Sequence, residues 1–407
     1  MNDKGTSTET FSDRKDLLEK IMKKEVLEEE VNGKINEVLK FLERGYQIKS
    51  IEKALNIKEK ELKLLFEFAR SRINVKQKYT KYDQLYMDQY SASYSTPESV
   101  GLYRAKKLSG KKILDIGCGS GMASIFLSQF SEVTGIDLNE ERILMAKLNG
   151  RKYEGKANFF VGNGLKLKLE PGEFDIIYSD PLRASGSKER SLLELQPNPM
   201  KIIEKFEGVV KGFVFDLPPF LNAASLIKIP GTLQYLSAGG NLSRLTLYSV
   251  EEKTRTFEAF MLDKNLSFQA DVSEAPELGQ KISQYIYVPD ASLFYSRLHG
   301  NYCNSLDLKL IAEEKRKAIY TGNSADPGFM GEVFEVASIV SSDSLKESLQ
   351  KEGIGKVILR YDSQNYYEEQ AILQKGLKGN ESGYIFKHGG MMIISRKITK
   401  TGTINNS

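Results

Sequence analysis

A glycine-rich turn between an apolar run and a helical pattern carries the strongest chemical signal in this sequence. Residues 113–121 read ILDIGCGSG, in which Asp115 ends the apolar run and glycines follow at Gly117, Gly119 and Gly121. Glycine is required where a ligand lies directly on the backbone, because a Cβ atom would collide with the ligand. The turn is therefore predicted to cradle a ligand.

The spacing and charge of this turn indicate which ligand it holds. A dinucleotide-binding turn reads G-x-G-x-x-G and places a pyrophosphate at the helix N-terminus. Here the third glycine comes one position early, and Met122 occupies its usual place. Asp115 would repel a pyrophosphate but suits the cationic amino-acid end of a sulfonium nucleotide. We therefore expect S-adenosylmethionine (SAM) as the cofactor.

Two further polar residues end the next predicted strands. Asp137 closes the run EVTGID about 20 residues after the first glycine, where an acid can accept hydrogen bonds from both ribose hydroxyls. Asn163 in VGNGL follows the third strand and is a candidate partner for the adenine amine. Ligands in open α/β sheets bind at the carboxyl ends of the strands, so these residues are expected to line one site.

The fourth predicted strand ends in the sequence DPLR, at the position where the acceptor of a methyl group would bind. Asp180 is a candidate to orient the acceptor and help remove its proton, and Arg183 to grip a phosphate or stack on a base. The alternative for Asp180 is a structural role in an Asp-Pro turn, where its side chain caps backbone amides. The alternative for Arg183 is a solvent-exposed position in a loop. Asp216 in DLPPF superficially resembles an amino-methyltransferase motif, but Leu217 is inserted and the fifth strand precedes it, so no catalytic role is assigned to it.

Strand and helix patterns alternate from Lys111 to about Asp263, which favours a mostly parallel sheet with right-handed crossovers. The strand runs are KKILDIG, EVTGID, NFFVG, FDIIYSD and GFVFDL, and helical runs are MASIFLSQF and ERILMAKLNG. Two later runs, LSRLTLYSV and RTFEAFMLD, are expected to pair antiparallel at the edge of this sheet.

Helical periodicity precedes the alternation, from Leu17 to about Ile73. Within it, residues 48–68 form two helical stretches joined near Asn56; these resemble a DNA-binding helix-turn-helix, but we favour simple packing. An aromatic connector follows, whose tyrosines are candidates either to stack on bases or to join the helices to the sheet, with the second role slightly favoured. They are Tyr79, Tyr82, Tyr86, Tyr90 and Tyr94.

The part of the chain from about Leu278 onward is expected to form an α+β domain. Strand candidates lie at residues 285–288, 334–339 and 357–361, and a hairpin at residues 384–395 turns at two consecutive glycines. No internal repeat is found.

These motifs resemble those of a known class of enzymes. ILDIGCGSG with Asp137 is similar to the class I SAM-dependent methyltransferases. Beyond it, TPESVGLYRAK (residues 96–106), the Asp180-Pro181 turn with Arg183, YVPDASLF (residues 287–294) and the C-terminal strands resemble the predicted RNA methylases that carry a C-terminal THUMP-like domain. The likeness spans roughly residues 90–397 and is looser outside the cofactor loop.

The resemblance implies an α/β fold with a Rossmann-like seven-stranded methyltransferase sheet, an N-terminal helical domain and a C-terminal α+β THUMP-like domain. It implies that SAM binds Asp115, Gly117, Gly119, Gly121 and Asp137, and that Asp180 and Arg183 face the acceptor. Two departures weaken it. The family tends to have a second arginine where this chain has Ala184, and an aspartate where it has Asn163. Asparagine can still bond adenine, whereas phosphate recognition beside Arg183 is less secure.

Composition narrows the remaining possibilities. The chain has 407 residues, so two or three domains are expected, and its net charge is +4, which allows a phosphate-rich partner without requiring one. Two cysteines and two histidines give neither a disulfide framework nor zinc-site spacing, so no metal is expected. No apolar run approaches the roughly 18–20 residues that span a bilayer, and the N-terminus is polar, so we expect no membrane association and a cytoplasmic protein.

The expected layout is a tail at residues 1–12, a helical domain with its connector at 13–95, a methyltransferase domain at 96–275, a THUMP-like domain at 276–400 and a second tail at 401–407. The leading hypothesis is methylation of a nucleotide in RNA, such as tRNA or rRNA, with RNA as the partner. One alternative is a small-molecule or protein methyltransferase. Another is a SAM- or RNA-binding protein without catalysis. The acceptor atom and the oligomeric state are not specified by the sequence.

Overall fold

The computed structural model describes residues 13–183, 192–219, 221, 229–250 and 254–398. The chain forms two compact units. Unit 1 comprises Met1–Leu217, Leu221–Lys228 and Tyr248–Glu251, and unit 2 comprises Pro218–Phe220, Ile229–Leu247 and Glu252–Ser407. This division differs from the expected domain layout, because the helical region falls in the same unit as the glycine-rich turn and unit 2 begins well before residue 276.

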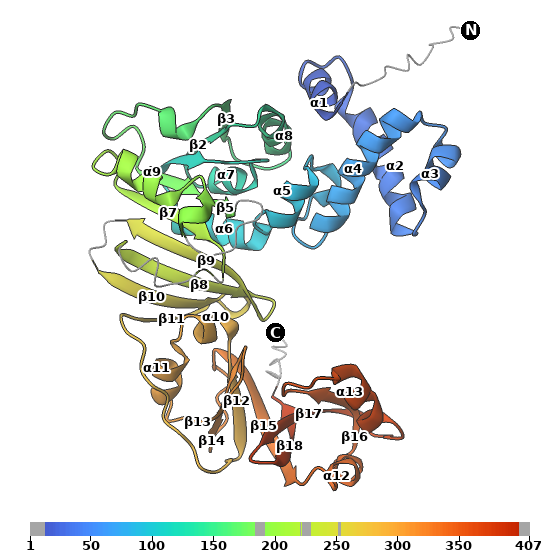
Figure 1. Cartoon of the computed structure of the whole chain (residues 1–407), viewed down its shortest axis with the longest axis vertical. Helices are drawn as coiled ribbons and strands as arrows, with labels where there is room; N and C mark the ends of the chain where they lie inside the picture. The colour runs from blue at the N-terminus through green and yellow to red at the C-terminus, as the bar shows by residue number, and fades with distance from the viewer. Residues whose placement is uncertain (1–12, 184–191, 220, 222–228, 251–253, 399–407) are drawn as a thin grey trace, which may run out of the picture. The chain divides into compact units, whose positions relative to one another are not determined.

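Unit 1 is an α/β structure preceded by helices (Figure 1). Its helices are α1 (Arg14–Met22), α2 (Glu28–Glu43), α3 (Ile48–Leu55), α4 (Glu59–Val75), η1 (Tyr82–Gln84), α5 (Gln89–Tyr94), α6 (Glu98–Lys107), α7 (Met122–Leu127), α8 (Glu140–Gly150), η2 (Gly164–Lys166), η3 (Leu192–Glu194) and α9 (Pro199–Phe206). Its strands are β1 (Lys112–Ile116), β2 (Glu132–Asp137), β3 (Asn158–Val161), β4 (Ile176–Ser179), β5 (Leu182–Arg183), β6 (Leu195–Gln196) and β7 (Gly212–Leu217).

Five strands of unit 1 form a parallel sheet in the order β3-β2-β1-β4-β7. All five come from runs that the sequence pattern predicts as strands. In register, Asp115 of β1 lies between Gly135 of β2 and Tyr178 of β4. Because the strands are parallel, their carboxyl ends meet at one edge, and the residues that follow β1, β2, β3 and β4 are brought together there.

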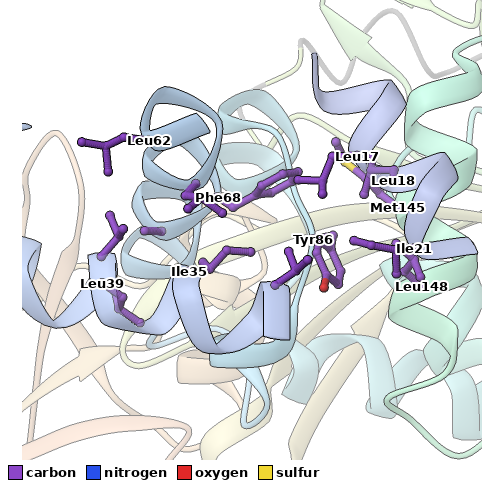
Figure 2. Packing of buried hydrophobic residues seen from close by; sticks show 14 of the residues in the cluster. Leu17, Leu18, Ile21, Ile35, Leu39, Leu62, Phe68, Tyr86, Met145 and Leu148 are labelled. Atoms are coloured by element: carbon purple, nitrogen blue, oxygen red, sulfur yellow. The ribbon is translucent and has the colours of Figure 1, made fainter. Parts of the chain in front are cut away.

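The N-terminal helices share one hydrophobic core with the sheet region. Leu17, Ile35 and Phe68 are fully buried, and the same cluster contains Met145 and Leu148 of α8 (Figure 2). This shared core explains why the helical region is not a unit of its own. The two helices predicted around Asn56 are confirmed as α3 and α4, with left-handed backbone at Asn56 between them, and their apolar faces pack into this core as the simpler interpretation predicts.

Unit 2 begins with strands that follow the parallel sheet in sequence. Its strands are β8 (Gly231–Ala238), β10 (Arg255–Met261), β11 (Leu266–Ala270), β12 (Tyr285–Pro289), β13 (Lys309–Glu313), β14 (Ala318–Gly322), β15 (Gly331–Val340), β16 (Ile354–Leu359), β17 (Glu381–His388) and β18 (Met391–Lys397). Strand β9 (Asn241–Val250) is divided between the two units. The helices of unit 2 are η5 (Leu262–Lys264), α10 (Ala291–Tyr295), α11 (His299–Asn304), α12 (Leu345–Lys351) and α13 (Tyr366–Gln374).

Two expectations about the first sheet are wrong. Its described strands number nine rather than seven, since β9, β8, β10 and β11 follow β7 in hydrogen-bonding order. The runs that form β9 and β10 do not pair antiparallel; β8 lies between them and pairs parallel with β10, while β10 pairs antiparallel with β11. Strand β8 was not predicted, because its sequence shows no apolar run. Its polar residues Thr232, Gln234 and Ser237 are nevertheless buried.

The rest of unit 2 has the α+β character that the sequence predicts. A seven-stranded sheet runs in the order β13-β14-β12-β15-β18-β17-β16. The predicted hairpin is confirmed as β17 and β18, turning at Gly389 and Gly390, which both have positive φ. None of the helices in the described parts of the chain is long and apolar enough to cross a membrane.

Candidate functional site

A cavity of about 640 Å³ in unit 1 opens at the carboxyl ends of the parallel strands. Its walls come from the turn after β1, the loops after β2, β3 and β4, helix α5, and the segment from β6 into α9. Of the residues singled out in the sequence, it is lined by Asp115, Gly117, Gly119, Asp137, Asn163 and Asp180. The structure therefore brings six of the eight candidates to one site; Gly121 does not line it, and the side chain of Arg183 lies outside the described residues.

Asp115 is a buried carboxylate in the wall of this cavity. Its residue surface is 1% exposed, and the Ser124 hydroxyl of α7 donates a hydrogen bond to its Oδ2 at 2.5 Å. Burial raises the pKa of Asp115 to about 7, and the charges of Asp180 and Asp137 act in the same direction, while the Ser124 bond opposes them. A carboxylate so placed is stabilised by a cation, which fits the ammonium group of SAM.

This pKa predicts pH-dependent binding of SAM. If only ionised Asp115 holds the ammonium, lowering the pH from 8 to 6 lowers the ionised fraction of Asp115 about tenfold. Protonation of the α-amino group of SAM offsets about 2.5-fold of this loss, so SAM binding should weaken about fourfold. Calorimetry in two buffers of different ionisation enthalpy should show proton release on binding below pH 7. Asp115→Asn should bind SAM weakly at both pH values. Equal parent affinity at pH 6 and pH 8 would contradict the role of Asp115.

The three glycines of the turn all have positive φ, but they are needed for different reasons. A Cβ on Gly119 would meet no atom within 4 Å and would project into open space beside the cavity, as expected of a ligand cradle. A Cβ on Gly117 would come 3.1 Å from Cδ of Pro197. A Cβ on Gly121 would come 2.7 Å from Cβ of Ala146 and 2.9 Å from Cζ of Phe159. Gly121 thus serves close packing of α7 rather than the cradle.

Alanine at Gly119 and at Gly121 should therefore have opposite phenotypes. Gly121→Ala is expected to lower the free energy of unfolding by about 2–3 kcal/mol, because it combines left-handed strain with overpacking. Gly119→Ala should cost only about 1 kcal/mol of stability but weaken SAM binding at least tenfold, by crowding the cradle. Urea unfolding and calorimetric titration of both variants would measure the two effects. Normal SAM affinity in Gly119→Ala would argue against the cradle.

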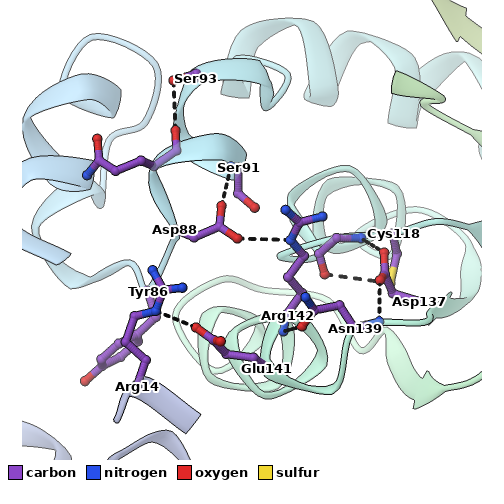
Figure 3. A network of polar contacts seen from close by, with 12 residues as sticks. Arg14, Tyr86, Asp88, Ser91, Ser93, Cys118, Asp137, Asn139, Glu141 and Arg142 are labelled. Carbon is purple, nitrogen blue, oxygen red and sulfur yellow. Dashed lines mark hydrogen bonds and ion pairs between the residues drawn. The ribbon is translucent and has the colours of Figure 1, made fainter. Parts of the chain in front are cut away.

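Asp137 is fixed by backbone donors at the end of β2. Its Oδ2 accepts a hydrogen bond from the amide of Gly119 at 2.9 Å, and its Oδ1 accepts one from the amide of Asn139 at 2.8 Å (Figure 3). The carboxylate is half-buried and therefore still presents oxygen to the cavity. This bond to Gly119 ties the second strand end to the glycine-rich turn, so the two parts of the predicted cofactor site form one structure.

The loops after β3 and β4 complete the cavity edge. Asn163 accepts a hydrogen bond from the amide of Leu165 at 3.0 Å through Oδ1, which fixes its side chain at the start of η2. Asp180 follows β4 directly, and the Thr96 hydroxyl donates to its Oδ2 at 3.4 Å. The backbone of Arg183 pairs with Leu195 in the short β5–β6 ladder.

The sequence pattern did not place two parts of the cavity wall beside the glycine-rich turn, although Tyr90 and Tyr94 were candidates to stack on bases. Helix α5 and the residues after it contribute Tyr90, Ser91, Tyr94, Ser95 and Thr96, and the β6–α9 segment contributes Leu195, Gln196, Pro197, Asn198 and Lys201. Asn198 is the N-cap of α9 and Pro199 its first residue, which is a local signal that could have located this helix. The tyrosines of the connector differ in burial. Tyr79 and Tyr86 are buried in the cores, as expected if they join the helices to the sheet, whereas Tyr90 and Tyr94 are exposed at the cavity.

Known proteins resemble the part of the chain that contains this cavity. The family described as "Methyltransferase domain" matches residues 113–194. A ubiquinone biosynthesis O-methyltransferase from Bordetella bronchiseptica is 25% identical over 205 residues, which cover 49% of this chain and 77% of that protein. A ubiquinone biosynthesis O-methyltransferase from Photobacterium profundum is 31% identical over 149 residues, which cover 35% of this chain and 57% of that protein.

Among solved structures, a candidate methyltransferase from Porphyromonas gingivalis W83 superposes with a TM-score of 0.71. It is 18% identical in sequence and covers 84% of this chain and 92% of its own. At this identity the match establishes the fold, and it extends well beyond residues 113–194.

Proposed function

We propose that this chain, a SAM-dependent methyltransferase, methylates a hydroxyl or amino group of a small-molecule acceptor. The observation that carries the proposal is that one cavity is lined by five of the six predicted cofactor residues together with Asp180 at the end of β4. The relatives named as ubiquinone biosynthesis O-methyltransferases support a small acceptor and an oxygen nucleophile.

The residues that line the cavity have different roles in the transfer of the methyl group. Asp115 would hold the ammonium of SAM and Asp137 its ribose hydroxyls, beside the glycine-rich turn. When bound, SAM supplies a methyl group whose carbon is activated by the positively charged sulfur. Asp180 would accept a hydrogen bond from the nucleophilic hydroxyl or amino group of the acceptor, orient that group and receive the proton it loses; in the transfer the bond from sulfur to the methyl group would break and S-adenosylhomocysteine would leave. The walls exclude water and hold the reactants near contact, which supplies much of the acceleration.

A second candidate is methylation of a nucleotide in RNA, and an observation in unit 2 favours it. The described residues of that unit enclose a cavity of about 850 Å³ lined by the cationic side chains Lys264, Arg316, Lys317, Arg360 and Lys397 and by the acidic Asp290 and Glu332. An excess of positive charge in a concave site suits a phosphate-bearing partner. The likeness to RNA methylases with a THUMP-like domain supports the same candidate.

Labelled SAM distinguishes the two candidates. The full chain is incubated with tritiated SAM and a cell extract separated into small molecules, protein and RNA. Label in the small-molecule fraction is expected, and mass spectrometry then identifies the methylated group. Label in RNA instead, with binding that weakens steeply as salt is raised, would support the second candidate and overturn the first.

A further inference from the structure

We propose that Tyr90 and Tyr94 of helix α5 form an aromatic platform that binds the planar ring of the acceptor. The inference rests on the proposed function and narrows its substrate class from small molecules in general to aromatic compounds that carry a hydroxyl or amino group on the ring. We call these two side chains the tyrosine platform.

Exposure separates the platform from the other tyrosines of the connector. Tyr90 is 40% exposed and Tyr94 is 56% exposed, whereas Tyr79 and Tyr86 are buried. The rings of Tyr90 and Tyr94 lie with centroids 4.8 Å apart and planes tilted by 53°, and both residues line the cavity. Single exposed aromatic residues are common, but two adjacent rings at the wall of a binding cavity offer a built apolar surface.

The platform lines the same cavity as Asp180, the residue that is proposed to meet the acceptor. Thr96, two residues after the end of α5, donates its hydroxyl hydrogen bond to Asp180 at 3.4 Å. Burial raises the pKa of Tyr90, and the charges of Tyr94, Asp88 and Asp180 add to this effect while Arg142 opposes it. Tyr90, Tyr94 and Asp180 all line one cavity, so a ring on the platform would lie in the cavity that also contains this carboxylate.

Helix α5 is anchored at its N-terminus by Asp88. Asp88 caps it by accepting a hydrogen bond from the Ser91 amide at 2.5 Å, and its other oxygen accepts one from Nε of Arg142 at 3.0 Å (Figure 3). Burial alone would raise the pKa of Asp88, but these bonds and the charge of Arg142 hold it below its ordinary value. Arg142 in turn donates its backbone amide to Asn139, next to the loop that carries Asp137. A platform fixed in this way loses little entropy when a ligand binds.

The chemistry of the platform favours an aromatic ring over a saturated one. The guanidinium of Arg142 lies over the Tyr90 ring, 5.2 Å from its centroid, and the planes of Tyr90 and Tyr94 are tilted rather than stacked. A saturated ring would gain only area burial on this surface. An aromatic ring also gains offset or edge-to-face contacts, which strengthen binding about threefold to tenfold per ring pair.

Matched probes test this difference. Binding of catechol and of trans-cyclohexane-1,2-diol is measured by ligand-observed NMR on the full chain saturated with S-adenosylhomocysteine. We expect the parent to bind catechol at least about fivefold more tightly than the diol. Tyr94→Ala and Tyr90→Ala should each lower this ratio about threefold, and Tyr94→Phe should preserve it. Tyr367→Ala is the control, since Tyr367 is 84% exposed in another tyrosine pair that is outside the cavity.

The outcomes separate the platform from the proposed function. Equal binding of the two probes by the parent, or a ratio unchanged in Tyr90→Ala/Tyr94→Ala with an unaltered thermal unfolding curve, would overturn the platform. The proposed function is judged independently by label transfer. If the parent labels small molecules and the double variant does so with the same KM, the function stands and the platform is wrong. If the parent labels no small molecule, the function is wrong whatever the probes show.

Discussion

Replacing Asp180 with alanine is expected to lower kcat for methyl transfer by a factor of about 10² or more while leaving the Kd for SAM within about twofold. Asp180 lies at the end of β4 in the same cavity as Asp115 and Asp137, and the hydroxyl of Thr96 bonds to it. The variant removes the group that orients the acceptor and takes up its proton, but no residue proposed to hold the cofactor. Steady-state kinetics with tritiated SAM and calorimetric titration would measure the two effects.

Two companion variants separate catalysis from turn structure at Asp180. Asp180→Asn keeps a side chain that can cap the Asp-Pro turn but cannot accept a proton, so it should be nearly as inactive as Asp180→Ala. Glu132→Gln removes an exposed carboxylate at the opposite end of the strands and should leave kcat unchanged. If Asp180→Asn were fully active and Asp180→Ala unstable, the residue would be structural and the proposed role in proton transfer would be wrong.

Replacing Arg104 with methionine is expected to lower the free energy of unfolding by about 3–5 kcal/mol, because it leaves the carboxylate of Asp216 buried without its cation. Arg104 is 2% exposed and Asp216 is fully buried; Nη1 of Arg104 lies 2.6 Å from Oδ2 of Asp216. The Tyr178 hydroxyl donates to the same Oδ2 at 2.8 Å. Burial alone would lower the pKa of Arg104, but the adjacent carboxylate holds it above its ordinary value. Urea unfolding would measure the loss.

The double variant Arg104→Met/Asp216→Leu should recover most of this stability, since it removes both charges together. Lys106→Met on the exposed side of the same helix is the matched control and should change stability by less than about 0.5 kcal/mol. Because Tyr178 lines the cavity two residues before Asp180, Arg104→Met should also reduce activity at temperatures where it remains folded. A double variant no more stable than Arg104→Met would show that the loss does not come from the stranded carboxylate.

The two units differ in how much of their structure local patterns could predict. The five parallel strands and the helices α7 and α8 follow from apolar periodicity, although α7 ends at Leu127 and the pattern extended to Phe130. Strand β8 shows the opposite case, because its polar residues Gln234 and Ser237 are buried and leave no apolar signature in the sequence; the Ser237 hydroxyl donates to Asp290, a residue far along the chain. The pairing order of β9, β8 and β10 also depends on contacts between distant segments, which no local pattern encodes.

The sequence by itself predicted most of the residues of one wall of the cavity, the wall proposed to hold the cofactor. Glycine spacing, an acid at the end of β1 and another at the end of β2 are local features, and the rule that parallel strands share a carboxyl edge brings them together without further information. Tertiary structure alone decided which tyrosines lie on the cavity, that Gly121 supports packing against Ala146, and that Asp216 is the buried partner of Arg104. The physical reason is that burial and charge pairing depend on how separate segments pack, whereas strand ends and turn glycines are fixed by backbone geometry within a few residues.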